Sequence, residues 1–478
     1  MIISRTRVGV DDIMAGAGEA TAGSPGQRKD LNLFALTWPI FLEISLFMMM
    51  GTADTIMLSA LSDDAVSAVG VANQLIFIAI LIMEVVANGA ALVVAQYIGA
   101  RRPDEAAKIA GVAMTVNLGL GLAVSAAFLA FGDGLLRAAN LHGAVLEDAQ
   151  GYLGIVGGWL VLQALINTMS SLVRTYGFTR ESMFVTLGMN VLHVALNYAL
   201  IFGNWGAPEL GVAGAAVSTV VSRGVAVLVF VWLLYRVMEV RIRLRDYVTM
   251  KKAYIMAVLK LGIPSGLEQV TYHACQSVFL YYVTFLGAAE LASRQYAMNI
   301  TSYIFLFCAA LGMGTAIIVG RLVGAGRQED AYGRVWRSLK WGLVMTMLVC
   351  AVVVSFRGSI AELFTDDAAI LSLVSQVILV SLLIEPGRCF NLILINALRA
   401  AGDAKITVYM GFVSMVGISL PLGYYLTFEA GLGLVGVFLA IAADEWIRGI
   451  AMWFRWRSRA WEGKALVAPS GAGEAATV

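Results

Sequence analysis

The sequence has few charged residues for its length. Only 14% of its 478 residues are Asp, Glu, Lys or Arg, against about 25% in an ordinary soluble domain. Its 33 basic and 32 acidic residues nearly balance, so net charge gives no indication of a nucleic-acid partner. No G-x-x-x-x-G-K-[ST] motif occurs, which excludes an ATP-hydrolysing site of the P-loop type.

Cysteine and histidine are also scarce, with four and three residues respectively. The four cysteines lie in apolar segments without paired spacing, which excludes a disulfide framework or a zinc site: Cys275, Cys308, Cys350 and Cys389. Neither a nucleophile–base pair nor a His/Asp/Glu cluster with metal-ligand spacing is found. We therefore expect no enzyme activity and no cofactor.

Apolar residues, by contrast, are abundant. They make up 59% of the chain, and the mean hydropathy is +0.80. A helix needs roughly 20 apolar residues to cross a bilayer. Twelve segments qualify and predict an all-α integral membrane protein: 33–58, 67–97, 107–132, 150–173, 182–203, 212–236, 254–286, 290–322, 334–356, 368–398, 405–427 and 432–455.

The basic residues indicate the orientation. The even-numbered connections and the two tails hold 26 Lys and Arg, whereas the other side holds three. The positive-inside rule then places both termini in the cytoplasm. The polar stretches 1–29 and 461–478 are predicted to be disordered cytoplasmic tails.

The two halves of the chain repeat each other at an offset of 225 residues. WPIFLE at 38–43 matches IPSGLE at 263–268, and YIGARRPDEA at 97–106 matches LVGAGRQEDA at 322–331. Six helices in each half predict two parallel lobes, 30–238 and 254–460, joined by a basic cytoplasmic linker at 239–253. A paired repeat of this kind is typical of transporters, although an old duplication that serves packing alone would leave the same pattern.

The first predicted helix carries an acid, Asp54, where a charge costs about 2.5–3.5 kcal/mol even on the lenient insertion scale. Such residues usually face a bundle interior or a wet cavity. Asn190, His193 and Asn197 recur at intervals of three and four, which places them on one helix face. We interpret this face as a cavity lining, although interhelical hydrogen bonding would use the same residues.

Acidic residues in the second half fall into two groups. Glu385 lies one turn from Arg388, and Glu445 one turn from Arg448, so each pair can neutralise itself. Glu268 and Asp444 are expected to have no local cation. Because Glu43 has a counterpart, Glu268, that follows a proline at the same repeat position, we expect Glu43 to have a structural role. Glu268 stays a candidate residue for ion coupling or substrate binding.

The order and spacing of several motifs resemble the multidrug and toxic-compound extrusion (MATE) family over residues 30–455. These motifs are GTADTIM after Pro39, VAQYIGARRPDEA with its later copy, VRTYG, LRAAGD and NYALIFGNWGAPELGVAGAA. The last is most similar to the NorM-like branch. The resemblance implies two six-helix bundles around a V-shaped central cavity, exporting cationic or amphipathic compounds against Na⁺ or H⁺.

The resemblance also implies site residues. Asp54 falls on the family's first-helix aspartate, and Asn167, His193 and Asn197 fall on its polar cluster, with His193 at a position that is usually Asn. In the second half, Tyr272 stands where some branches have an acid, with Glu268 one turn earlier. Glu385 lies near the family's tenth-helix acid.

These observations predict a monomeric efflux transporter in the bacterial inner membrane, with the lipid bilayer and small organic cations or amphiphiles as its partners. Asp54 is the expected coupling acid for H⁺ or Na⁺, and Na⁺ near Asp54 is the one metal considered. Pro39 and Pro264 are expected to let their helices bend. A flippase for lipid-linked or amphipathic compounds remains the alternative, and a membrane-embedded enzyme or receptor is a remote one.

Overall fold

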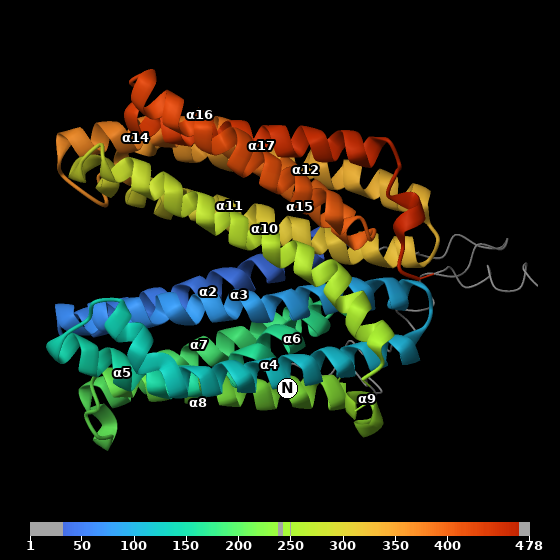
Figure 1. The fold of residues 1–478 in the computed structure, drawn as a ribbon, viewed down its shortest axis with the longest axis horizontal. Helices are drawn as coiled ribbons and strands as arrows, with labels where there is room; N and C mark the ends of the chain where they lie inside the picture. Colours follow the sequence, from blue (N-terminus) through green and yellow to red (C-terminus); the bar gives the residue numbers. More distant parts are fainter. Residues whose placement is uncertain (1–31, 238–241, 249, 468–478) are drawn as a thin grey trace, which may run out of the picture. The chain divides into compact units, whose positions relative to one another are not determined.

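The computed structural model describes residues 32–237, 242–248 and 250–467. The predicted N-terminal tail, part of the predicted linker and residues 468–478 lie outside this range. Helices dominate the described residues, which contain no strand (Figure 1). The long helices of the first half are α2 (Leu33–Ser59), α3 (Asp63–Gly99), α4 (Pro103–Ala138), α5 (Gly143–Gly158), α6 (Val161–Thr175), α7 (Thr179–Phe202) and α8 (Val212–Trp232).

The second half contains α10 (Lys252–Thr284), α11 (Ala288–Gly324), α12 (Gln328–Ser355), α14 (Ala368–Ala400), α15 (Ala404–Phe412), α16 (Leu420–Tyr424) and α17 (Gly433–Arg457). Short elements complete the described part: η1 (Asn204–Gly206), η2 (Leu233–Val237), α9 (Leu244–Val248), α13 (Arg357–Ala361), η3 (Val413–Ser419), η4 (Tyr425–Glu429) and η5 (Glu462–Lys464).

The predicted membrane segments are all helical. Nine helical spans in the described chain are long and apolar enough to cross a bilayer, and the bent pair α5–α6 makes a tenth. The two other predicted segments are α10 and α17, of 33 and 25 residues. They fall outside that count and both carry buried charges, Glu268 in α10 and Asp444, Glu445 and Arg448 in α17.

The structure confirms the internal repeat. The starts of α3, α4, α5 and α7 precede those of α11, α12, α14 and α15 by the 225 residues found in the sequence. One difference is that α14 is a continuous helix of 33 residues, whereas its counterpart is broken into α5 and α6 with a bend of 47°. Ser125 accepts a hydrogen bond from the Val161 backbone N–H at this break, at 3.1 Å.

The chain divides into two compact units. Unit 1 contains Leu42–Ile263, and unit 2 contains Leu33–Phe41 and the chain from Pro264 onward. These units differ from the predicted lobes because α2 and α10 are each shared between them. The divisions fall two residues after Pro39 and at Pro264, the prolines inside these two helices.

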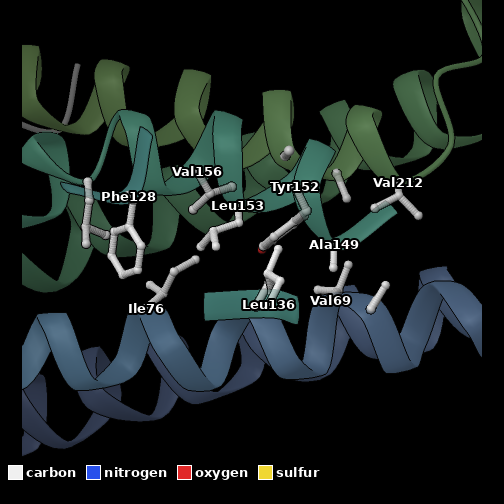
Figure 2. Close-up of a cluster of buried hydrophobic side chains, with 14 of the residues drawn as sticks. Val69, Ile76, Phe128, Leu136, Ala149, Tyr152, Leu153, Val156 and Val212 are labelled. Carbon is white, nitrogen blue, oxygen red and sulfur yellow. The ribbon is translucent and has the colours of Figure 1, made fainter. Parts of the chain in front are cut away.

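The core of unit 1 lies between α3, α4, α5 and α8, which run side by side (Figure 1). Figure 2 shows Val69 and Ile76 of α3 facing Leu153 and Tyr152 of α5. Burial of each large apolar side chain contributes roughly 1.5–3 kcal/mol in water. In a membrane, contact between close-fitting surfaces supplies more of the stabilisation.

Unit 1 also contains a close backbone crossing between α3 and the start of α10. A Cβ added to Gly89 would lie 2.3 Å from the Val258 carbonyl oxygen, and one added to Gly262 would lie 2.2 Å from the Val85 carbonyl oxygen. Only glycine fits at these two positions. Small residues at crossings are the usual way for membrane helices to approach closely.

The largest interfaces in unit 2 join α14 to α11 and to α17. Its segment 404–429 alternates between α-helix and π-helix, in η3 and η4. Pro421 lies in this segment and has no backbone N–H to donate. Helix irregularities of this type are common where a proline interrupts the hydrogen-bond ladder.

The packed part of the chain extends beyond residue 460, where the sequence predicts the C-terminal tail to begin. Residues 461–478 are predicted to be a disordered tail, but Trp461 is fully buried and stacks on Trp456, with ring centroids 4.2 Å apart. Lys464 also forms an ion pair with Asp403 at 2.7 Å. The prediction is therefore wrong for the start of this segment, because an apolar ring and an ion pair attach it to unit 2.

Candidate functional site

Asp54 lies on α2 in unit 1 and is 5% exposed. Asn197 Nδ2 donates a hydrogen bond to Asp54 Oδ1 at 2.6 Å, and His193 Nε2 lies 3.3 Å from the same oxygen. Both partners belong to α7 and have no solvent exposure. The structure thus brings together three of the predicted site residues, contributed by two helices.

The predicted polar face of α7 is buried along its length, but its members make different contacts. Asn190 donates to the Thr186 carbonyl of its own helix at 3.0 Å. His193 Nε2 lies 3.2 Å from Thr219 Oγ1 of α8, in addition to Asp54. Only the C-terminal part of this face therefore contacts the acid.

Asn167 lies on α6 and is separate from this group. Its side-chain oxygen accepts a hydrogen bond from Gln163 Nε2 at 2.7 Å, and no contact in the described chain joins it to Asp54. Among the predicted site residues of unit 1, three buried polar atoms have no hydrogen-bond partner in the described chain: Asn167 Nδ2, His193 Nδ1 and Asn197 Oδ1. Buried polar atoms are normally satisfied by protein or water, so these atoms are available to a ligand or to water.

Two further residues that we did not predict as site residues extend the Asp54 group. The Tyr152 hydroxyl of α5 donates to Asn73 Oδ1 at 3.3 Å and hydrogen-bonds Thr219. Arg223, one turn after Thr219 on α8, interacts electrostatically with Asp54 and Tyr152. The spacing of Thr219 and Arg223 is a sequence signal for one helix face, whereas nothing in the sequence indicates Tyr152.

Glu43 is fully buried near the start of α2. Arg174 Nη1 donates to Glu43 Oε1 at 2.8 Å, and Ser182 Oγ donates to the same oxygen at 2.9 Å. The repeat places Glu268 and Arg399 at the corresponding positions of unit 2, and these two also form an ion pair. The symmetric pairs agree with the structural role expected for Glu43, and the role of Glu268 in ion coupling or substrate binding stays a prediction.

Unit 2 contains a larger network of buried charges. Arg388 Nη1 lies 2.7 Å from Glu385 Oε1, and Arg388 Nε lies 3.2 Å from Glu445 Oε1. Asn391 donates to Glu445 Oε2 at 2.8 Å. The predicted neutralisation of Glu385 by Arg388 is confirmed.

Our expectation that Glu268 and Asp444 have no local cation is wrong. Arg448 Nη2 lies 2.6 Å from Asp444 Oδ2, at the i, i+4 spacing that brings helix residues together. Arg448 also lies 3.6 Å from Glu268 and 3.2 Å from Glu445. The partner of Glu268, Arg399, is distant in sequence and close only in the fold.

The remaining predicted residues have simpler surroundings. Tyr272 packs edge to face against His273 and hydrogen-bonds Gln276. Glu84 of α3 is partly buried and has no ion pair within the described chain. No group of three or more His, Cys, Asp or Glu suited to a metal occurs among the described residues.

Comparison with known proteins decides the family. The MatE family model matches residues 39–199 and 264–425, one block in each half and more than half of the chain. The chain belongs to the MATE family. Members are transporters, so this MATE protein is a multi-pass membrane transporter and not an enzyme.

The relatives extend over nearly the whole chain. An uncharacterized transporter of Bacillus subtilis, YisQ, is 41% identical over 94% of this chain and 98% of its own length. A probable multidrug resistance protein NorM of Thermotoga maritima is 26% identical over 93% and 95% respectively. A MATE crystal structure in a bent conformation has a TM-score of 0.83 at 22% identity, covering 91% of this chain and 99% of the other.

Proposed function

We propose that this MATE protein exports cationic or amphipathic small molecules in exchange for H⁺ or Na⁺, with Asp54 as the coupling acid. The observation that carries the proposal is the contrast between Asp54 and the other buried acids of the membrane helices. Five of these have an arginine within 4 Å: Glu43, Glu268, Glu385, Asp444 and Glu445. In the described chain, no Lys or Arg lies within 4 Å of Asp54. Glu84 of α3, which is only partly buried, has no ion pair within the described chain either.

An acid without a cation in direct contact suits coupling. Desolvation favours the neutral form of a carboxyl group, whereas a cation beside it favours the charged form. Asp54 can therefore exchange its partner between a coupling ion and a cationic substrate. Each charge that moves inward gains about 2.3 kcal/mol per 100 mV of membrane potential, which supports export against a concentration gradient.

The contact with His193 favours a proton over Na⁺. An imidazole can take up and pass on a proton through its two ring nitrogens, whereas it has no comparable role with Na⁺ in this site, and His193 Nε2 lies 3.3 Å from Asp54 Oδ1. In unit 2 the acids Glu268 and Glu385 are already paired with arginine, which also supports coupling in unit 1. Roles of Tyr272, Pro39 and Pro264 in transport stay predictions.

The names of two relatives, both multidrug resistance proteins, support a range of small-molecule drugs as substrates. The test is counterflow in proteoliposomes with a panel of organic cations, run under a Na⁺ gradient and under an H⁺ gradient separately. We expect accumulation that follows the H⁺ gradient. Robust accumulation driven by Na⁺ alone at clamped pH would contradict the proton assignment, and no accumulation under either gradient would contradict ion-coupled export.

A further inference from the structure

The N-terminal unit contains a buried arginine that has lost the acids of its repeat counterpart. Arg223 of α8 corresponds to Arg448 of α17 at the offset of 225 residues. Arg448 pairs with three carboxylates, those of Glu268, Asp444 and Glu445. These acids satisfy the guanidinium and fix its position in unit 2.

The corresponding positions of unit 1 cannot do the same. Thr219 and Val220 stand where unit 2 has Asp444 and Glu445. Glu43 stands where unit 2 has Glu268, but it pairs with a different arginine: its Oε1 accepts hydrogen bonds from Arg174 and Ser182, and its Oε2 has no hydrogen-bond partner among the described residues. The repeat has therefore kept the arginine and replaced or redirected every acid that would pair with it.

The surroundings of Arg223 leave its positive charge available to an anionic group of a ligand. Its Nε atom is buried without a hydrogen-bond partner, and no carboxylate of the described chain lies within 4 Å of the guanidinium. The side chain as a whole is intermediate between buried and exposed. An arginine in a membrane helix without a counter-ion is energetically costly, and arginine is the residue best suited to bidentate binding of a carboxylate.

The groups around Arg223 are those of the Asp54 site. The charge of Arg223 interacts electrostatically with Asp54, Tyr152 and His193. The site thus presents one acid and one fixed cation, which do not form an ion pair within 4 Å in the described chain. A simple organic cation would meet Asp54 favourably and Arg223 unfavourably, whereas a zwitterion can match both.

We propose that Arg223 is a specificity-determining residue that binds an acidic group of the substrate, so that the preferred compounds are amphipathic zwitterions carrying a carboxylate. This rests on the proposed function of the Asp54 site and narrows its substrate class. Arg223 recognises the anionic group, and Asp54 recognises the basic group in exchange with the coupling ion.

The test uses pairs of compounds that differ only in whether the carboxylate is esterified. Norfloxacin and its ethyl ester form one pair, and rhodamine 110 and its methyl ester rhodamine 123 form the other. Dissociation constants are measured for the full-length protein in nanodiscs without any ion gradient, so the result does not depend on coupled transport. Variants are Arg223→Gln, Arg223→Lys and, as a control, Arg137→Gln, which removes an exposed charge of the same unit.

We expect the wild type to prefer the acid in at least one pair. Arg223→Gln should weaken binding of that acid by about 10-fold, equivalent to about 1.4 kcal/mol, and leave binding of the ester unchanged or tighter. Arg223→Lys should keep part of the preference, and Arg137→Gln should keep all of it. Absence of a preference for the acid in both pairs, including absence of binding, would overturn the proposal, as would an equal loss for acid and ester in Arg223→Gln.

The same variants separate this inference from coupled export. In proteoliposomes, Arg223→Gln should still accumulate the esters under an ion gradient. If no compound accumulates in the wild type but the acid preference in binding depends on Arg223, the specificity proposal stands and ion-coupled export fails. Accumulation of the acids by Arg223→Gln at the wild-type rate would overturn the specificity proposal alone.

Discussion

Individual charged residues in the membrane helices have two kinds of surroundings. Glu43 and Arg174 form a buried ion pair, and Ser182 donates a hydrogen bond to the same oxygen of Glu43. Asp54 instead has an amide and an imidazole as neighbours. A buried ion pair resists change because removing one partner leaves an uncompensated charge, whereas a carboxylate without an arginine can gain and lose a cation.

The first pair gives a stability prediction. Glu43→Gln should lower the free energy of unfolding by about 3–5 kcal/mol, the usual cost of breaking a buried ion pair. Asp330→Gln, which breaks the exposed pair with Arg327, should change it by about 0–1 kcal/mol. Thermal unfolding of the purified protein in detergent measures both, and equal effects would contradict the structural role of Glu43.

The polar face of α7 gives a prediction about activity. Asn197→Ala removes the hydrogen bond to Asp54, worth about 1.5–3 kcal/mol for a charged acceptor, and should slow gradient-driven transport by about 10-fold or more. Asn190→Ala removes a bond to the residue's own helix and should slow it less than about 3-fold. Transport rates in proteoliposomes provide the measurement, and similar rates for the two variants would show that the whole face acts as one lining.

Helix packing in unit 1 depends on where the small residues lie along α3. Gly89 meets the backbone of α10, whereas Gly70 on the same helix has no heavy atom within 4 Å of an added Cβ. An added methyl group is therefore expected to lower the stability of the protein at Gly89 but not at Gly70. The close crossing also joins the start of α10 to unit 1. The predicted lobe boundaries instead assign all of α10 after residue 253 to the second lobe.

This contrast is testable with one substitution at two sites. Gly89→Ala should destabilise the protein by about 1–3 kcal/mol because the α3–α10 crossing must open. Gly70→Ala should be neutral or stabilise by up to about 1 kcal/mol, since alanine is the better helix former. Melting temperatures of the two variants in the same detergent test this, and a stable Gly89→Ala variant would exclude the close crossing.

For the whole molecule, the helices and the repeat could be predicted from the sequence because both are carried by long periodic signals. An apolar run of about 20 residues specifies a membrane helix, and the offset of 225 residues reappears in the helix starts. The contacts of Asp54 with His193 and Asn197 could also be predicted, because the spacing of these two residues places them on one face of α7.

Other features depend on contacts that no local pattern encodes. Glu268 meets Arg399 across 131 residues, and Tyr152 reaches the site from a helix whose sequence gives no polar periodicity. The burial of Trp461 likewise depends on stacking with Trp456. The Asp444–Arg448 pair is different, because its i, i+4 spacing on one helix face is a signal that the sequence itself contains.

The orientation of the whole chain remains a prediction from charge asymmetry. The 26 basic residues on one side against three on the other place both termini in the cytoplasm. A fluorescent protein fused after Val478 should therefore fold and fluoresce, and alkaline phosphatase fused there should be inactive. An active phosphatase fusion would contradict the predicted orientation and place the C-terminus outside the cytoplasm.

The most direct test of the central claim compares wild type and Asp54→Asn in proteoliposomes by two readouts, substrate exchange at equal concentrations and uphill accumulation driven by an ion gradient. The Asn variant is nearly isosteric but cannot exchange a charge. We predict that it loses uphill accumulation, while exchange persists with a weaker apparent affinity because the amide no longer pairs with the basic group of the substrate. Uphill accumulation at the wild-type rate would contradict the assignment of Asp54 as the coupling acid.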